Sequence, residues 1–184
     1  MSLLKVYKFP DSVLRDKSKP VKEVTASIQD LVKSMFETMT LENGIGLAAP
    51  QVGEKLRLFV MDVPVRDPND PEDETKIQYD PIAIINPEIV AGEGLIQYEE
   101  GCLSCPELAV LVDRQANIEL KYLDIEGRPS ILQASGLKAV CIQHEIDHLN
   151  GVLLVDKLSR LKRDLYKQKR LRILKDEKDA ATIL

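Results

Sequence analysis

The chain has 184 residues, 44% of them hydrophobic and 30% charged, which is typical of a soluble globular protein and sufficient for one domain with a substantial core. No run of 18 apolar residues occurs, which argues against a membrane-spanning helix and a membrane partner. The N-terminus lacks the apolar stretch of a secretory signal, so we expect a cytoplasmic protein.

The net charge of −5 is distributed unevenly along the chain. Residues 157–184 contain ten Lys or Arg against four Asp or Glu, whereas the preceding 156 residues contain fifteen against twenty-six. A basic segment attached to an acidic body suggests that the segment has a partner of its own.

Hydrophobic periodicity predicts a helix over 27–42, stopped by Asn43-Gly44, and a mostly apolar helix over 137–149, stopped by Asn150-Gly151. A basic helix is expected over about 159–178. Apolar runs between turn residues predict strands at 56–62, 82–86, 94–98, 108–112, 117–124 and 129–134. Helices and strands do not alternate regularly, so we predict an α+β fold with antiparallel or mixed β-sheets.

The stretch 64–81 interrupts this pattern with four prolines and a cluster of acidic residues. Such a composition predicts an exposed loop, because proline has no N–H to donate to a helix or a sheet and charged residues favour solvent. Its role is not evident from the sequence.

The segment His144-Glu145-Ile146-Asp147-His148 is the most informative motif, and it contains both histidines of the chain. On a helix, residues i and i+4 share a face, so both imidazoles can reach one metal ion. Glu145 would lie beside this ion without being a ligand, which suits a general base. The alternative is an exposed helix with two ordinary histidines. Apolar neighbours argue against it, because a buried histidine needs a partner.

A catalytic ion usually has three protein ligands and one open position. No histidine follows His148, and the acidic residues beyond it lie in or near the basic tail. Cys102 is therefore our third ligand, and Gly101 before it would let the backbone approach an ion or a substrate closely.

A structural zinc site is the rival interpretation. Cys102-x2-Cys105 together with Cys141-x2-His144 has the spacing of a Cys3His site. A closed site of this kind would leave Glu145 and the second histidine of the motif without a role. We therefore favour Cys105 and Cys141 as small core residues.

A glycine-rich segment, GIGLAAPQ at 44–51, is the third informative stretch. Its small residues permit close approach of another backbone, and Gln51 offers an amide donor. A tight turn after the first helix would explain the glycines equally well. No Lys-Ser/Thr pair follows, so it is not a phosphate-binding loop.

Together the segments GIGLAAPQ (44–51), EGCLS (100–104) and HEIDH (144–148) resemble the three signature motifs of the peptide deformylases, intact and in the same order. The resemblance covers most of residues 1–160. It implies sheets packed around a central metal-binding helix, a catalytic metallohydrolase domain at 1–158, and a basic C-terminal helix and tail of the same domain at 159–184.

The resemblance also implies an activity: hydrolytic removal of the N-formyl group from the N-terminal methionine of newly synthesised proteins, with release of formate. N-formylmethionyl nascent peptides would be the substrates. Family members commonly use Fe2+, and Zn2+, Ni2+ or Co2+ can occupy the site. By matching position, the metal ligands would be Cys102, His144 and His148.

The remaining roles also follow from matching position in the motifs. Glu145 would be the catalytic acid/base, and Gln51 and the backbone N–H of Leu103 would face the developing oxyanion. The substrate groove would be lined by Ile45, Gly46 and Gly101. Wall residues for the methionine side chain are expected one and two turns before the first histidine, at Val140 and Leu137.

Two departures from the family pattern concern the surroundings of the site. The loop at 64–81 is longer than in compact members. Some relatives carry a basic, substrate-contacting residue shortly after EGCLS, where this chain has Glu107-Leu108-Ala109 and the nearest arginine is Arg114.

The basic tail has two interpretations. It can be a solvated helix that packs on the body through its leucines. Alternatively, it can dock to ribosomal RNA through its basic residues; some members of the family that the chain resembles end in such a helix. A different class of function, an RNA-binding adaptor with a structural zinc, predicts no hydrolysis. We expect the protein to be a monomer.

Overall fold

Three helices and two β-sheets make up an α+β fold in the computed structural model, which describes residues 3–65 and 77–182. Short 3-10 helices at Ser12–Arg15, Ala49–Val52 and Leu154–Lys157 connect these elements. The helices and strands are α1 (Ala26–Leu41), β1 (Gly46–Ala48), β2 (Leu58–Met61), β3 (Ile82–Glu93), β4 (Ile96–Glu100), β5 (Val110–Arg114), β6 (Asn117–Leu123), β7 (Pro129–Ser135), α2 (Gly136–Leu149) and α3 (Arg160–Thr182).

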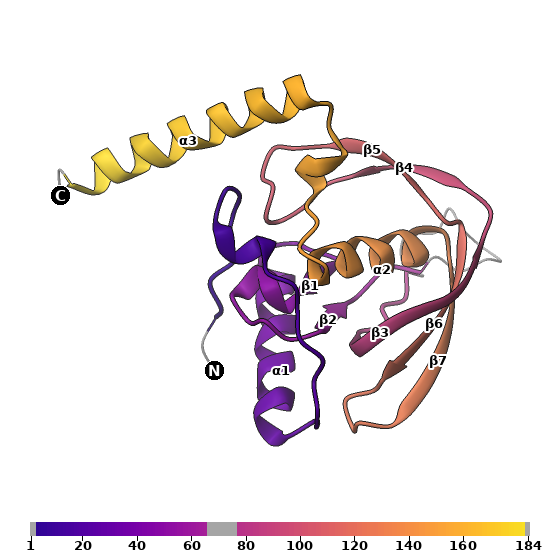
Figure 1. Cartoon of the computed structure of the whole chain (residues 1–184). Helices are drawn as coiled ribbons and strands as arrows, with labels where there is room; N and C mark the ends of the chain where they lie inside the picture. Colours follow the sequence, from indigo (N-terminus) through magenta and orange to yellow (C-terminus); the bar gives the residue numbers. More distant parts are fainter. Residues whose placement is uncertain (1–2, 66–76, 183–184) are drawn as a thin grey trace.

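The larger sheet has the strand order β1-β2-β3-β6-β7, and each neighbouring pair is antiparallel. Strands β4 and β5 form a separate antiparallel pair. Helix α2 lies at the centre of the molecule, with the larger sheet on one side and β4-β5 on the other (Figure 1). The predicted α+β class with a central helix is therefore confirmed.

Strand β2 explains how the core is built on two sides of the larger sheet. All four of its residues are buried, which accounts for the unbroken apolar run in the sequence. Phe59 and Met61 belong to the apolar cluster that includes Ile142 of α2. Leu58 and Val60 belong to a second cluster, which includes residues of α1. Opposite faces of one strand thus hold the two helices in place.

Strand β3 is longer than predicted: it runs from Ile82 to Glu93, whereas the predicted strand ended at Asn86. Asn86 adopts a left-handed conformation with φ of 52°, and the pairing register with β6 shifts between Ile85 and Glu88. The side-chain amide of Asn86 accepts from Val21 N–H and donates to Val21 C=O, both at 2.8 Å. This bulge accommodates a proline that has no N–H to donate, and the strand continues beyond it.

The glycine segment also differs from its simplest interpretation as a turn. Residues 46–48 pair with β2 as a short edge strand, and a 3-10 helix follows at once. Residues 66–76 of the predicted acidic loop lie outside the described residues. At the base of that loop, the backbones of Val65 and Gln78 exchange two hydrogen bonds of 2.9 Å.

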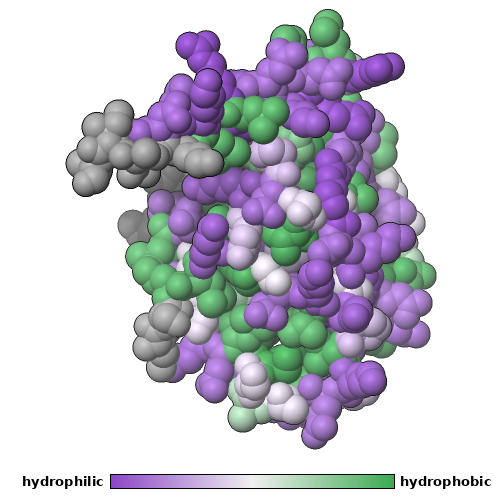
Figure 2. Space-filling view, turned by 60° about the vertical axis from the view of Figure 1, so that its left-hand side comes forward, coloured by the Kyte–Doolittle hydropathy of each residue, from purple (hydrophilic) through white to green (hydrophobic). Residues whose placement is uncertain are grey.

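Helix α3 begins on the body and then extends away from it (Figure 1). Tyr166, only 8% exposed, stacks on Phe9 with ring centroids 5.8 Å apart, and the buried Arg170 donates to the Phe9 carbonyl. The upper part of the molecule, where α3 lies, is mostly hydrophilic with separate hydrophobic side chains (Figure 2). In the portion of the chain that the structure describes, no helix has the length and apolarity needed to cross a bilayer.

Candidate metal centre and substrate cleft

Three side chains predicted as metal ligands converge in the structure. Atoms of Cys102, His144 and His148 that can each donate to a metal ion lie within 4.8 Å of one another. The Cys102 sulfur is 3.2 Å from Nε2 of His148. Both histidines lie on α2, four residues apart, and Cys102 lies on the loop of residues 101–109 that connects β4 to β5. We call this loop the Cys102 loop.

The orientation of α2 follows from its apolar residues. Ala139, Ile142 and Leu149 pack into the core cluster beneath the larger sheet. The two histidines share another face of the helix, because residues four apart lie one above the other. This face meets the Cys102 loop, where His148 contacts Cys102. His148 is 1% exposed and Glu145 3% exposed, so both polar side chains are removed from bulk water.

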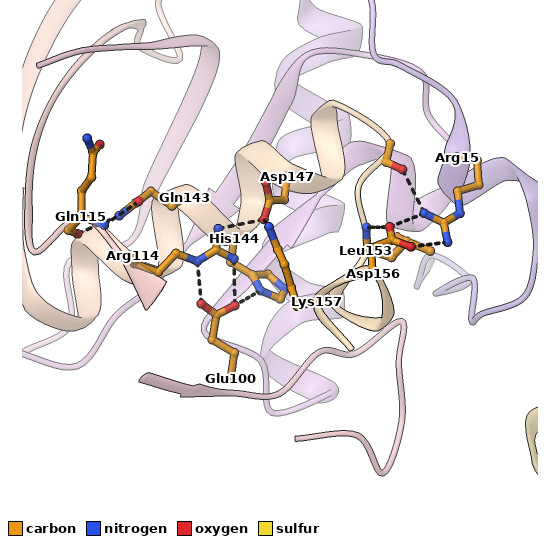
Figure 3. Close-up of polar contacts among 11 residues, drawn as sticks. Arg15, Glu100, Arg114, Gln115, Gln143, His144, Asp147, Leu153, Asp156 and Lys157 are labelled. Atoms are coloured by element: carbon orange, nitrogen blue, oxygen red, sulfur yellow. Dashed lines mark hydrogen bonds and ion pairs between the residues drawn. The ribbon is translucent and has the colours of Figure 1, made fainter. Parts of the chain in front are cut away.

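A buried network of charged groups orients His144 (Figure 3). Its Nδ1 lies 2.8 Å from Oε2 of Glu100, the last residue of β4. Arg114 donates to both oxygens of Glu100, from Nε at 2.7 Å and from Nη2 at 2.9 Å. Arg114 Nη1 also donates to Asp147 at 2.8 Å, and Lys157 lies 3.0 Å from the same carboxylate. Because Nδ1 is engaged, Nε2 of His144 is the nitrogen available to an ion.

This network also fixes the ionisation of Glu100. Burial opposes the charged form, but hydrogen bonds from Arg114 and His144 lower the pKa of Glu100 to about 2. The sequence interpretation did not identify this role, and it considered Arg114 only as the arginine nearest to the cleft edge. With 7% exposure and two carboxylate partners, Arg114 supports the centre from inside. One feature of the sequence could have indicated this role: Glu100 directly precedes Gly101-Cys102.

Glu145 lies beside the predicted ligands, and one of its carboxylate oxygens is unsatisfied. Among the described residues, its Oε2 has no hydrogen-bond partner, and burial raises the pKa of Glu145 to about 7. The backbone of Gly46 passes so close that an added Cβ there would overlap the Glu145 carboxylate and the Cys141 sulfur. This contact explains why the glycine segment needs a residue without a side chain at this position.

Gln51 has a fixed amide orientation. Its Oε1 accepts a hydrogen bond of 2.7 Å from the Ala48 N–H, so its amide NH2 must face the opposite way. Nε2 donates to Ser104 Oγ at 3.2 Å and lies 3.9 Å from the Cys102 sulfur. An N–H donor is thus held beside the ligand group.

A cleft of about 550 Å³ opens onto this group. The wall residues expected for methionine, Leu137 and Val140, border it. His148 is not among the lining residues and lies beneath them. The other predicted site residues all border the cleft: Ile45, Gly46, Gln51, Gly101, Cys102, Leu103, His144 and Glu145.

The residues fit a metal ion. One thiol and two imidazoles form a donor set that suits iron, zinc, nickel or cobalt. Within the described residues, Oε2 of Glu145 is buried without a hydrogen-bond partner, and a water molecule on the ion could donate to it. The rival Cys3His site is disfavoured, because the group of converging ligands contains neither Cys105 nor Cys141. Cys141 instead directs its sulfur to the Ile45 carbonyl, 3.7 Å away.

Comparison with known proteins agrees with this geometry. The model of the polypeptide deformylase family matches residues 3–164. The chain belongs to the peptide deformylase family. A peptide deformylase of Bradyrhizobium diazoefficiens is 50% identical over 165 residues, 89% of this chain and 92% of that protein. The family resemblance is therefore confirmed.

Solved structures of deformylases share the fold. The Ehrlichia chaffeensis enzyme in complex with actinonin has a TM-score of 0.84 and 40% identity, covering 94% of this chain and 98% of that one. The Met-Ala-Ser-bound enzyme from Acinetobacter baumannii has a TM-score of 0.76 and 31% identity, covering 85% and 99%. The protein is thus a metal-dependent hydrolase that removes the N-formyl group from the N-terminal methionine of newly synthesised proteins and releases formate.

The Glu100 network predicts an effect on metal affinity. Glu100→Gln should weaken metal binding about 10- to 100-fold, because the neutral amide cannot hold His144 and Arg114 as the carboxylate does. Competition with a chromogenic chelator measures the dissociation constant. Glu126→Gln, which breaks a surface ion pair with Arg128, is the matched control and should leave it unchanged. Equal metal affinities for the two variants would show that Glu100 does not contribute to metal binding.

Proposed function

We propose that Cys102, His144 and His148 hold the catalytic ion and that Glu145 moves the protons of the deformylase reaction. The observation that supports this assignment is the convergence of a sulfur and two imidazole nitrogens within 4.8 Å at the floor of a cleft. Three protein ligands leave one position for water or substrate, which is the arrangement of a catalytic site and not of a structural one.

Each polar group has a task in this proposal. When bound, the ion would lower the pKa of a water molecule and polarise the formyl carbonyl. Glu145 takes a proton from the attacking water and delivers it to the amine that leaves. The Gln51 amide and the Leu103 backbone N–H donate hydrogen bonds to the oxygen as it gains negative charge. Formate and a peptide with a free amino terminus are the products.

The cleft accounts for recognition of a formyl-methionyl terminus. We assign Ile45, Gly46 and Gly101 to the groove for the peptide backbone, since all three border the cleft and the two glycines allow close approach of another backbone. Leu137 and Val140 offer an apolar wall, where burial of a methionine side chain contributes about 1.5–3 kcal/mol. The relative from Acinetobacter baumannii with bound Met-Ala-Ser supports a peptide with N-terminal methionine as the ligand of this cleft.

The proton-transfer role is tested by Glu145→Gln. This variant should retain one equivalent of metal and lose about 10²- to 10⁴-fold in formate release from formyl-Met-Ala-Ser, because the amide cannot accept the proton. Coupled detection of formate and elemental analysis are the two measurements. Glu99→Gln is the control: its carboxylate also borders the cleft but is exposed, so turnover should stay within a few-fold. Full activity of the Glu145 variant, or cleavage of an internal peptide bond, would contradict the proposal.

We further propose Fe2+ as the resident ion and the cytoplasm as the compartment. A mixed thiolate and imidazole set binds Fe2+, Zn2+, Ni2+ and Co2+, so the choice depends on metal supply as well as affinity. A ferrous ion bound by a thiolate requires reducing surroundings. The three free cysteines are consistent with such a compartment.

Metal identity is measurable on protein purified without oxygen from its native host. Elemental analysis should find iron near one equivalent, and deformylase activity should fall on exposure to air. Reconstitution with Ni2+ should give an enzyme that is stable in air, since this ion is not readily oxidised. Zinc at one equivalent in the anaerobic preparation would refute iron.

We also propose that α3 docks the enzyme to ribosomal RNA. Tyr166 and Arg170 are buried against the body, which leaves the other side of the helix exposed. Lys162, Lys167 and Arg172 are exposed along the helix and would meet phosphates, which attract cations. This partner would hold the cleft near its nascent-chain substrates. Monomeric state stays a prediction.

The docking role predicts a salt-sensitive interaction. Alanine at Lys162, Lys167 and Arg172 together should weaken ribosome binding at least about 10-fold and reduce the slope of log affinity against log salt by about 2. Co-sedimentation over a range of salt concentrations measures both. Alanine at the exposed Lys22, Lys33 and Lys121 changes net charge equally and should have little effect. An equal loss of ribosome affinity in both triple variants would show that binding depends on net charge and not on α3. Unchanged affinity in both variants would reject docking through α3.

A further inference from the structure

Cys105 is a buried thiol that the deformylase reaction does not use. All three cysteines are free and border the cleft, but only Cys102 belongs to the converging ligands. Cys105 has no exposed surface, whereas Cys102 is partly open to the cleft. One accessible thiol therefore lies next to one that solvent cannot reach.

The backbone brings these two cysteines close together. The N–H of Cys105 donates to the carbonyl of Cys102 at 3.0 Å, which closes a four-residue turn. The Cα atoms at the ends of such a turn lie within about 7 Å, and a disulfide needs about 4.4–6.8 Å.

The turn is held from three sides. Ser104, between the two cysteines, accepts a backbone hydrogen bond of 2.8 Å from Phe9 and a side-chain bond of 3.2 Å from Gln51. The hydroxyl of Tyr166 donates to the Pro106 carbonyl at 2.9 Å. The turn that brings the two cysteines together is therefore a fixed property of the fold, since three separate elements anchor the loop that carries them.

We propose that Cys102 and Cys105 form a site of reversible disulfide formation, in which Cys105 captures Cys102 after oxidation. The inference rests on the proposed function of Cys102 as a metal ligand, because the disulfide would withdraw that ligand. Hydrogen peroxide is the oxidant and a dithiol is the reductant that restores the site. Both are classes of reagent outside the protein.

The chemistry balances in two steps. The Cys102 thiol reacts with hydrogen peroxide to give a sulfenic acid and one water. The Cys105 sulfur then attacks the Cys102 sulfur, the S–O bond breaks, and a second water leaves with the Cys105 proton. A dithiol reverses this by exchange and becomes a disulfide itself. Without Cys105, the sulfenic acid would proceed to sulfinic and sulfonic acids, which are irreversible.

Cys141 is not suited to the same role. It lies on the rigid helix α2, and its sulfur is directed to the Ile45 carbonyl at 3.7 Å. It shares no turn with Cys102, and among the described residues no hydrogen bond joins the two. Cys141 is therefore the matched control, since it is an equally buried thiol in the same cleft.

The experiment treats metal-loaded enzyme with limited hydrogen peroxide and follows thiols, mass and metal together. The wild-type protein should fall from three free thiols to one, lose about 2 Da, yield a Cys102–Cys105 peptide in mapping and release its metal. Dithiothreitol and fresh metal should then restore the three thiols and the initial activity. A disulfide-linked Cys102–Cys141 peptide would overturn the proposal. Loss of all three thiols through addition of oxygen atoms, without a disulfide, would also overturn it.

Two variants complete the test. Cys105→Val should gain about 32 or 48 Da at Cys102 under the same treatment and should not recover with dithiothreitol, and Cys105→Ser provides the same readout if the valine disturbs packing. Cys141→Val should still form the disulfide. The metal content of untreated Cys102→Ala tests the proposed function separately, because retained metal would refute the ligand role of Cys102. Peptide mapping of the oxidised wild-type protein decides independently whether the Cys102–Cys105 disulfide forms.

Discussion

The ion pair between Glu100 and Arg114 is the interaction on which the geometry of the metal centre depends. Glu100 ends β4, Arg114 ends β5, and Asp147 on α2 receives the remaining arm of the guanidinium. A buried ion pair seldom adds net stability, because desolvation offsets the attraction. Its benefit here is orientation: one charged network fixes His144 through its Nδ1 and joins α2 to the smaller sheet.

Two buried carboxylates lie close to the ligands and are held in opposite states. Burial opposes the charge of Glu100, but the hydrogen bonds from Arg114 and His144 lower its pKa to about 2. Glu145 lacks such partners, and burial raises its pKa to about 7. One carboxylate thus stays ionised and orients a ligand, while the other can exchange a proton near neutral pH. Different surroundings therefore divide one functional group between two tasks.

Sequence reasoning placed the elements of the candidate site correctly where local spacing encodes them. The i and i+4 histidines of HEIDH and the buried helix that carries them follow from helical periodicity alone, and α2 begins within one residue of the prediction. The link from Glu100 to His144 spans 44 residues and depends on how β4 packs on α2, so no local pattern predicts it. The continuation of β3 beyond Asn86-Pro87 was missed for a related reason, because distant contacts with Val21 stabilise the bulge.

Cys102 is the only proposed ligand outside α2, so its position depends on the anchoring of its loop. That loop is fixed by Phe9 from the N-terminal segment, by Gln51 from the glycine segment and by Tyr166 from α3. Segments more than 150 residues apart in the sequence thus support one sulfur atom. Because the same contacts hold Cys105 beside that sulfur, the constraint that positions the ligand also makes a close second thiol a lasting feature of the site.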